Sequence, residues 1–489
     1  MSAMAKVSKM FNRHRVEFLI PLSIFLMAFL LRAVALDQVE LRGDEVTYIK
    51  SGLIYMQLIS QGKLPIPPYV YEWTTSTPPV GFFIIGLVVW MMGYRALPTP
   101  FPPQRLVPNP VDTLHPLWNR EVWTWPKDQI EILLTARVTD VIFSSLTCVV
   151  MYYLGKTLKD RKIGLMAAIL WAFNPLSLLL GRLALLDSIM IFFLTLSILT
   201  FYKGIQQSKL NLIILSGVLF GLTTGSRLFG WLLVPIGFFW FLGLAIGKYL
   251  VGLKLGKTLT IRYILFSLLT VLLVGIVTLV AVYPYLWPNP VNQFIKPFTA
   301  AERLHGTRHL GFNPYFLLQL VVKQPGQALE AGATLTMLEI VFFALGIVFA
   351  IWQMIKARQI LLPEALLLSW FVVPILFLSF FITTKYWHYP FIVTPAVAIL
   401  AATGIDRVFQ GASRTSLMLT GAAFAVNITS VLMFYPTYRY DNFEDVIIGI
   451  IPVKLGVLIL IPLVAMLLLS VYFHSAKGRK STRRGSPLP

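Results

Sequence analysis

The sequence predicts an all-α protein that crosses a membrane many times. Of its 489 residues, 57% are hydrophobic and only 13% are charged, and the mean hydropathy is +0.75. Soluble proteins carry about 25% charged residues, and a soluble fold of this length could not bury so much apolar surface. Apolar runs of spanning length, roughly 17–25 residues, recur along the chain. The sequence therefore favours a polytopic bundle of transmembrane helices.

Twelve apolar runs make up the predicted bundle. Several of them are short, so the pattern predicts about 12 transmembrane helices, in a range of about 11–13. We expect one transmembrane domain over residues 1–489, because a helical bundle in lipid behaves as one unit. In chain order the runs are 17–36, 132–154, 163–181, 184–202, 210–226, 228–247, 262–283, 333–355, 363–382, 389–404, 415–434 and 447–472.

The basic residues are distributed unevenly between alternate connecting segments. Short alternate segments and the two ends hold 23 of the 41 Lys and Arg residues, whereas the long loops 37–131 and 284–332 hold 7 and 4. Cytoplasmic segments are enriched in Lys and Arg, so both termini, including the basic tail 473–489, are predicted inside and both long loops outside. This spread explains the net charge of +20 without a nucleic-acid partner. We expect an integral multi-pass protein of a prokaryotic cell membrane, with membrane lipids as partners.

The first outer loop is predicted to contain two helices that lie parallel to the membrane. After Gly43, apolar residues recur at helical spacing, at Val46, Ile49, Leu53 and Met56. Residues 80–94 form an apolar stretch that is short for a span and is flanked by Pro and aromatic residues, as in an interfacial helix. These helices would cover a site on the outer face of the membrane, like a roof. The second long loop, rich in His, Arg, Asn and aromatic residues, could line another side of that site.

Two adjacent carboxylates, Asp44 and Glu45, stand in the stretch "LRGDEVTYIKSG" just past the first span. Local rules favour a structural role, because Asp44 could cap the following helix and Glu45 suits the positive end of its dipole. Their position favours chemistry, because a base or metal ligand beneath the roof would face a lipid head group. The residues alone leave both hypotheses open.

Further charged residues lie in or beside later spans. Arg182 and Asp187 stand in "GRLALLDSIMIFF", and ionisable groups within a membrane mark either a site or a pair that pins two helices together. Arg137 and Asp140 are three residues apart within run 132–154, and we expect them to pair with each other.

The stretch "GVLFGLTTGSRLFGW" contains a regular glycine pattern followed by one arginine. Gly217, Gly221 and Gly225 recur every four residues, the small-xxx-small pattern of tightly packed helices. Arg227 follows them at the outer end. Its fork of donors could meet a phosphate oxygen, or the side chain could snorkel to the interface.

Two other outer segments hold polar candidates. Lys385 and His388 in "TTKYWHYPF" could act as phosphate-binding or acid–base groups, although their Tyr and Trp neighbours are typical of an aromatic belt. Arg303, His305 and His309 lie in "ERLHGTRHL" and could contact a donor or an acceptor. The spacing of the two His residues fits a metal pair on a helix, but the glycine between them argues against a helix, so the metal stays unassigned.

The order of these motifs resembles one superfamily. An acidic pair follows the first span, "PPVG" opens the second loop helix, and "GRLALLDS", "GLTTGSRLFG", "YPYLWPNP" and "KYWHYPFIVTPAVAILAATGID" follow in turn. The chain resembles the GT-C glycosyltransferases, close to the protein O-mannosyltransferase and aminoarabinose transferase group, over most of residues 1–410. The resemblance implies a GT-C fold and an enzyme that transfers a monosaccharide from a polyprenyl- or dolichyl-phosphate donor on the outer or lumenal face, usually with inversion. Mannose transfer to protein Ser or Thr is the first expectation, and a lipid or glycan acceptor is the alternative.

The resemblance implies roles for the residues of this chain that match the family's motifs. The resemblance implies Asp44 as the base with Glu45 beside it, and Asp187 as the second acidic residue with Arg182 before it. Arg227 falls where relatives often have Lys near the donor phosphate. Thr77 is a departure, because relatives often have His or Lys before the "PP" pair. A divalent cation is optional in this interpretation, since Arg182, Arg227, Lys385 and His388 could bind the phosphate.

Two other classes of protein are alternatives to the transferase, namely a transporter and a non-catalytic membrane scaffold. A transporter commonly shows paired broken helices and similar halves, whereas this sequence shows no internal symmetry and gathers its polar residues at one membrane face. A non-catalytic scaffold would leave the outer acidic residues dispensable.

Overall fold

The computed structural model describes residues 3–34, 36–39, 41–64, 77–97, 126–249, 252, 260–305, 316–317, 320, 335–357, 362–382, 388–409 and 421. Contacts divide the chain into two units, Met1–Arg407 and Val408–Pro489. The site and its supporting helices belong to the first unit.

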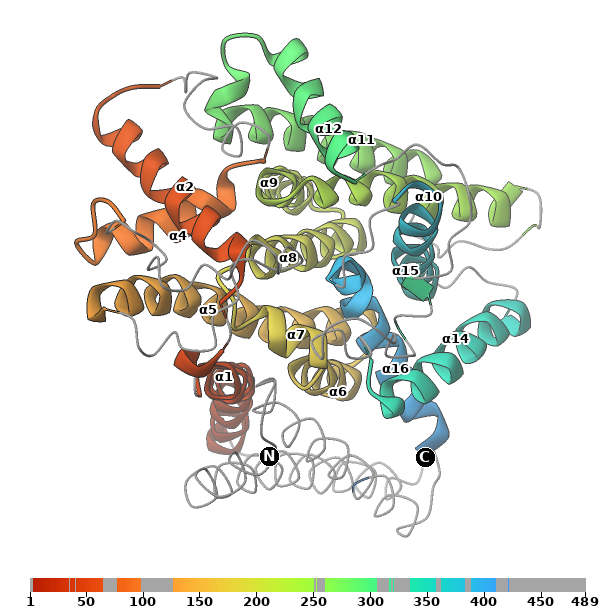
Figure 1. Ribbon diagram of the computed structural model, residues 1–489. Helices are drawn as coiled ribbons and strands as arrows, with labels where there is room; N and C mark the ends of the chain where they lie inside the picture. The colour runs from red at the N-terminus through yellow and green to blue at the C-terminus, as the bar shows by residue number, and fades with distance from the viewer. Residues whose placement is uncertain are drawn as a thin grey trace, which may run out of the picture. The chain divides into compact units, whose positions relative to one another are not determined.

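Every regular element in the described part of the chain is helical (Figure 1). The α-helices are α1 (Ala3–Ala33), α2 (Gly43–Ser60), α4 (Val80–Met91), α5 (Lys127–Leu158), α6 (Arg161–Ala172), α7 (Pro175–Leu180), α8 (Leu186–Gln207), α9 (Leu210–Ser226), α10 (Leu233–Tyr249), α11 (Ile261–Val282), α12 (Pro290–His305), α14 (Met337–Ala357), α15 (Leu362–Phe381) and α16 (Thr394–Phe409). The 3₁₀ helices among the described residues are η1 (Leu36–Gln38), η4 (Leu228–Leu232), η5 (Pro284–Leu286) and η6 (Tyr389–Val393).

Seven segments of the described chain are long and apolar enough to cross a membrane, which confirms a multi-pass protein. They are Lys127–Leu158, Leu186–Gln207, Leu228–Tyr249, Ile261–Val282, Glu339–Lys356, Pro363–Phe381 and Tyr389–Phe409. Of the predicted runs 415–434 and 447–472, the structure describes only residue 421, so the total of about 12 stays a prediction.

The predicted run 163–181 forms two helices instead of one. α6 ends at Ala172, and α7 begins at Pro175. The side chain of Asn174 caps α7 by accepting a hydrogen bond from the backbone N–H of Ser177 at 3.0 Å. Pro175 suits the first helical position because it has no N–H to leave unpaired. The chain therefore turns here, and α7 leads into the loop that carries Arg182.

The glycines of α9 pack against neighbouring helices, as their spacing predicts. A Cβ atom on Gly217 would lie 2.6 Å from Cβ of Val274, and one on Gly221 would lie 2.5 Å from Cβ of Thr278, both on α11. Such distances leave no room for a side chain. α9 and α11 therefore run parallel in close contact, and their C-terminal ends reach the same end of the bundle.

The two helices expected in the first long loop are present as α2 and α4, and they pack against each other (Figure 1). They cross at Gly52 and Gly86, where a Cβ atom on Gly52 would lie 2.6 Å from the carbonyl oxygen of Phe82. Tyr48 and Tyr55 of α2 also contact the Phe82 ring, with centroids 5.5 and 6.1 Å apart. This crossing fixes α2, whose first turn carries the acidic pair. Their orientation parallel to the membrane stays a prediction.

Candidate functional site

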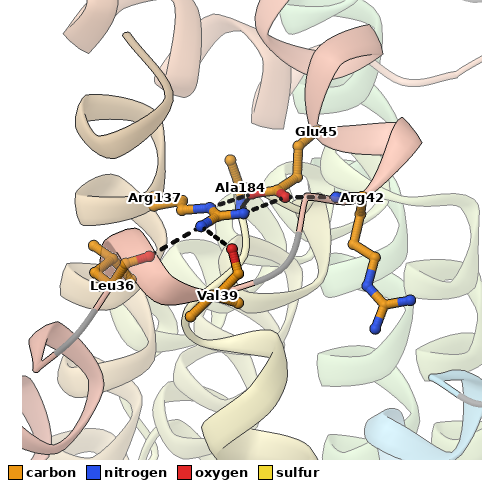
Figure 2. Close-up of polar contacts among 6 residues, drawn as sticks. All are labelled: Leu36, Val39, Arg42, Glu45, Arg137 and Ala184. Carbon is orange, nitrogen blue, oxygen red and sulfur yellow. Dashed lines mark hydrogen bonds and ion pairs between the residues drawn. The ribbon is translucent and has the colours of Figure 1, made fainter. Parts of the chain in front are cut away.

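Glu45 is fully buried at the first turn of α2, where it accepts four hydrogen bonds (Figure 2). Arg137 of α5 donates twice, from Nε to Oε1 and from Nη2 to Oε2, each at 2.8 Å. The backbone N–H of Ala184 donates to Oε1 at 2.8 Å, and that of Arg42 donates to Oε2 at 2.9 Å. Since Arg42 is the N-cap of α2, Glu45 completes the backward half of a capping box. The expected capping by Asp44 is wrong, because α2 begins at Gly43 with Arg42 as its N-cap, and the carboxylate that caps it is that of Glu45.

The guanidinium of Arg137 also binds the segment between α1 and α2. Its Nη1 donates to the carbonyl oxygens of Leu36 at 2.9 Å and Val39 at 2.8 Å (Figure 2). The expected pairing of Arg137 with Asp140 is wrong, because the Arg137 guanidinium donates to both carboxylate oxygens of Glu45 and to two carbonyl oxygens, and neither Asp140 oxygen accepts from it. Arg137 and Glu45 together join the first turn of α2 to three other segments: the α1–α2 connection, α5 and the α7–α8 loop.

Asp44, next to Glu45, has a different environment. Its side chain is exposed, and its charge interacts with those of Arg227, Asp187 and Arg42. Protein atoms around the carboxylate raise the pKa of Asp44 above 3.8 by desolvation; Arg227 lowers the pKa, and Asp187 and Glu45 raise it further. Asp44 is thus an accessible carboxylate with an increased proton affinity.

Arg227 and Asp187 form an ion pair beside Asp44. Nη2 of Arg227 lies 2.6 Å from Oδ2 of Asp187, and both side chains are largely buried. Arg227 is the C-cap of α9, and Asp187 lies in the first turn of α8. The two helices are antiparallel neighbours, so these ends meet.

Arg182 makes a separate contact. Its Nη2 donates to the carbonyl oxygen of Val34 at 2.6 Å, at the end of α1. The alternative in which Arg182 pairs with Asp187 is wrong, because the loop from Gly181 to Leu185 directs Arg182 toward α1 while Asp187 turns to Arg227 on α9.

Tyr48 is a site residue that sequence reasoning missed. It lies one turn after Asp44, is buried, and contacts Arg227, whose Cζ lies 5.6 Å from the centre of the Tyr48 ring. Burial raises the pKa of the Tyr48 phenol, so the group stays protonated. The spacing of four residues, which places Asp44 and Tyr48 on one helix face, was the available signal.

The segment containing His388 lies close to η4, which begins directly after Arg227. The rings of His388 and Tyr389 meet edge to face at 5.0 Å between centroids, and the ring of Tyr389 lies 4.6 Å from that of Phe229 on η4. Lys385 and His309 lie outside the described residues, as do the side chains of Arg303 and His305. Within the described part of the chain, no three His, Cys, Asp or Glu side chains are grouped as they would be to hold a metal ion.

Comparisons with known proteins agree with this architecture. Residues 131–287 match the family model of dolichyl-phosphate-mannose-protein mannosyltransferases. ArnT from Cupriavidus metallidurans, solved bound to undecaprenyl phosphate, aligns with a TM-score of 0.55 and 16% identity over 95% of this chain and 72% of that one. The archaeal oligosaccharyltransferase AglB from Archaeoglobus fulgidus, solved with an inhibitory peptide and a dolichol-phosphate, aligns with a TM-score of 0.53 and 12% identity over 87% of this chain. No curated protein sequence matches the chain.

The comparisons establish the fold of the chain. The chain spans 55% of the length of AglB, and at these identities the structural likeness establishes the fold. Residues 131–287 match the mannosyltransferase family model, and the chain shares the GT-C fold of ArnT and AglB. This confirms the predicted fold class and the resemblance seen in the order of the motifs.

The buried ion pair predicts a large effect of substitution at Arg137. Replacing Arg137 with Met leaves the Glu45 carboxylate buried without its cation, a change that typically costs about 3–5 kcal/mol. We expect a clearly lower thermal unfolding midpoint in detergent. Lys127→Met, on the same helix, is the control, because the Lys127 side chain is 90% exposed and its pairing with Glu131 is a surface contact at 3.7 Å. Equal midpoints for the two variants would show that the buried pair does not stabilise the fold.

Proposed function

We propose that this protein transfers a monosaccharide from a polyprenyl- or dolichyl-phosphate carrier to an acceptor hydroxyl, with inversion at the anomeric carbon. The matched mannosyltransferase family and the fold shared with ArnT support a lipid-phosphate donor. The observation that carries the proposal is the meeting of an accessible carboxylate, Asp44, with a buried cation, Arg227, at one end of the bundle.

Asp44 acts as the general base in this proposal. A hydroxyl is a poor nucleophile near neutral pH, so a carboxylate within hydrogen-bond reach accelerates its attack. Asp44 takes the proton from the acceptor hydroxyl, the acceptor oxygen bonds to the anomeric carbon, and the bond from that carbon to the phosphate oxygen breaks. The products are the glycoside, the polyprenyl phosphate and protonated Asp44. Inversion follows because the acceptor attacks opposite the departing phosphate.

Arg227 binds the departing phosphate. Its Nη2 is held by Asp187, whereas its Nε is a buried donor with no hydrogen-bond partner among the described residues. Buried donors normally have an acceptor, and a guanidinium edge suits a phosphate oxygen. Because charge develops on the phosphate oxygen as its bond breaks, a fixed cation stabilises the transition state more than the ground state.

The surrounding residues hold these two groups in place. Asp187 and the ring of Tyr48 fix the guanidinium of Arg227 from two directions. Glu45 does not touch the reacting atoms in this proposal. Its bonds to Arg137 and Ala184 set the position of the turn that presents Asp44.

The remaining predicted contacts extend this site. Arg182, His388 and Lys385 are proposed as further cations that bind the donor phosphate. The loop with Arg303, His305 and His309 is proposed to contact the donor or the acceptor. A divalent cation at the phosphate is a further option in the proposal. The transfer takes place on the outer or lumenal face, with both termini cytoplasmic. Mannose transfer to protein Ser or Thr is the first reaction to assay, and a lipid or glycan acceptor is the alternative.

Replacement of Asp44 tests the assignment of the base. Asp44→Asn keeps the shape of the side chain but cannot accept the proton, so we expect transfer from a radiolabelled polyprenyl-phosphate sugar to fall at least about 10²-fold without a change in protein level. Asp37→Asn is a control, because Asp37 is an exposed acidic residue on η1 of the same loop. Wild-type turnover in the Asp44→Asn variant would remove Asp44 from the mechanism.

The pH profile provides a second test. Because the pKa of Asp44 is raised, the base is charged and active above this raised pKa, and kcat/KM falls as the pH drops through it. Asp187→Asn removes a negative charge that raises the pKa of Asp44, and it leaves the charge of Arg227 unpaired, which lowers that pKa. The acidic limb of the kcat/KM profile of this variant should therefore move to lower pH. The measurement is kcat/KM against pH for both proteins. An unchanged limb, or one moved to higher pH, would contradict the proposed coupling.

A further inference from the structure

Helix α12 presents an apolar stripe that the described part of the protein leaves uncovered. Trp287, at the end of η5, is 43% exposed, and Val291 and Ile295 on α12 are 73% and 54% exposed. Val291 and Ile295 are four residues apart and so lie on one face of the helix. The next face carries the exposed polar side chains of Asn292 and Lys296. The helix thus separates apolar and polar exposed surfaces.

The third face of α12 is held against the protein. Phe294 contacts Trp231 of η4, with ring centroids 5.4 Å apart in an edge-to-face arrangement. It also packs on the buried cluster of Leu279, Tyr283, Tyr285 and Leu286. Since this contact fixes the rotation of α12, the apolar stripe lies beside the packed face and stays exposed, whereas Asn292 and Lys296 lie opposite Phe294.

The stripe follows an exposed apolar surface on a candidate membrane span. α11 is a candidate span, and its exposed side chains include Leu269, Leu273 and Val277 along one face. The chain passes from α11 through η5 directly into α12. Nε1 of Trp287 donates to the carbonyl oxygen of Val280 in the last turn of α11 at 2.8 Å, which fixes the indole at the point where the two surfaces join.

We propose that α12 lies in the membrane–water interface, with Trp287, Val291 and Ile295 inserted at the boundary between head groups and acyl chains and with Asn292 and Lys296 facing water. A Trp at the end of a span followed by an amphipathic helix is suited to this depth. The occupant of the stripe is the lipid surface itself. This inference rests on the multi-pass fold and is independent of the transfer reaction.

Spin labelling tests the proposal in liposomes of zwitterionic phosphatidylcholine. A nitroxide is attached to Ile295→Cys, to Val291→Cys and to Lys296→Cys, and collision with oxygen, which concentrates in lipid, is compared with collision with a water-soluble nickel chelate. The chain has one native cysteine, Cys148, and it is buried, so the unvaried protein is the labelling control. The substituted side chains are exposed, so each variant should keep the unvaried protein's thermal midpoint.

We expect oxygen to be favoured over nickel at positions 291 and 295, with the opposite order at position 296. Nickel favoured equally at all three positions would place α12 in water and overturn the proposal. Low collision with both reagents at positions 291 and 295 would show that protein covers the stripe, which also overturns it. Neither outcome depends on whether the sugar-transfer assay succeeds.

Discussion

The buried ion pair between Glu45 and Arg137 is the interaction on which the rest of the site depends. It joins two residues that are 92 positions apart and binds three segments through six hydrogen bonds. A buried carboxylate or guanidinium is costly unless each is paired and hydrogen-bonded. Here both conditions are met, so the first turn of α2 has one stable position. That position presents Asp44 toward Arg227.

The two adjacent carboxylates therefore have different environments and, in our account, different roles. Glu45 is enclosed and fully hydrogen-bonded, whereas Asp44 is exposed and near an ion pair whose cation keeps one buried donor available. A helix cap and a base are thus compatible, because neighbouring residues on a helix point about 100° apart. Two close helix contacts also hold the site. α2 crosses α4 at two glycines, which fixes the helix that carries Asp44, and α9 packs on α11, which fixes the helix that ends at Arg227. Rigid helices of this kind hold a site more accurately than loops do.

Much of the fold follows from local sequence patterns. Apolar runs predicted most of the spans, helical spacing predicted α2, and glycines four residues apart predicted the contact of α9 with α11. The partners of charged residues were harder to predict. Arg137 was expected to pair with Asp140 three residues away, and Arg182 was considered as a partner of Asp187, because sequence spacing reveals only neighbours on one element. Arg137 in fact pairs with Glu45, and Asp187 pairs with Arg227. Both partners come from other helices, and only tertiary packing brings them together.

The most direct measurement of the central claim is an experimental structure of the protein with a polyprenyl phosphate bound. The account predicts a phosphate oxygen within hydrogen-bond distance of Nε of Arg227, with Asp44 facing the space beside the phosphate and Glu45 still bonded to Arg137. A phosphate held away from Arg227, or a Glu45 carboxylate released from Arg137 and turned toward the phosphate, would contradict it.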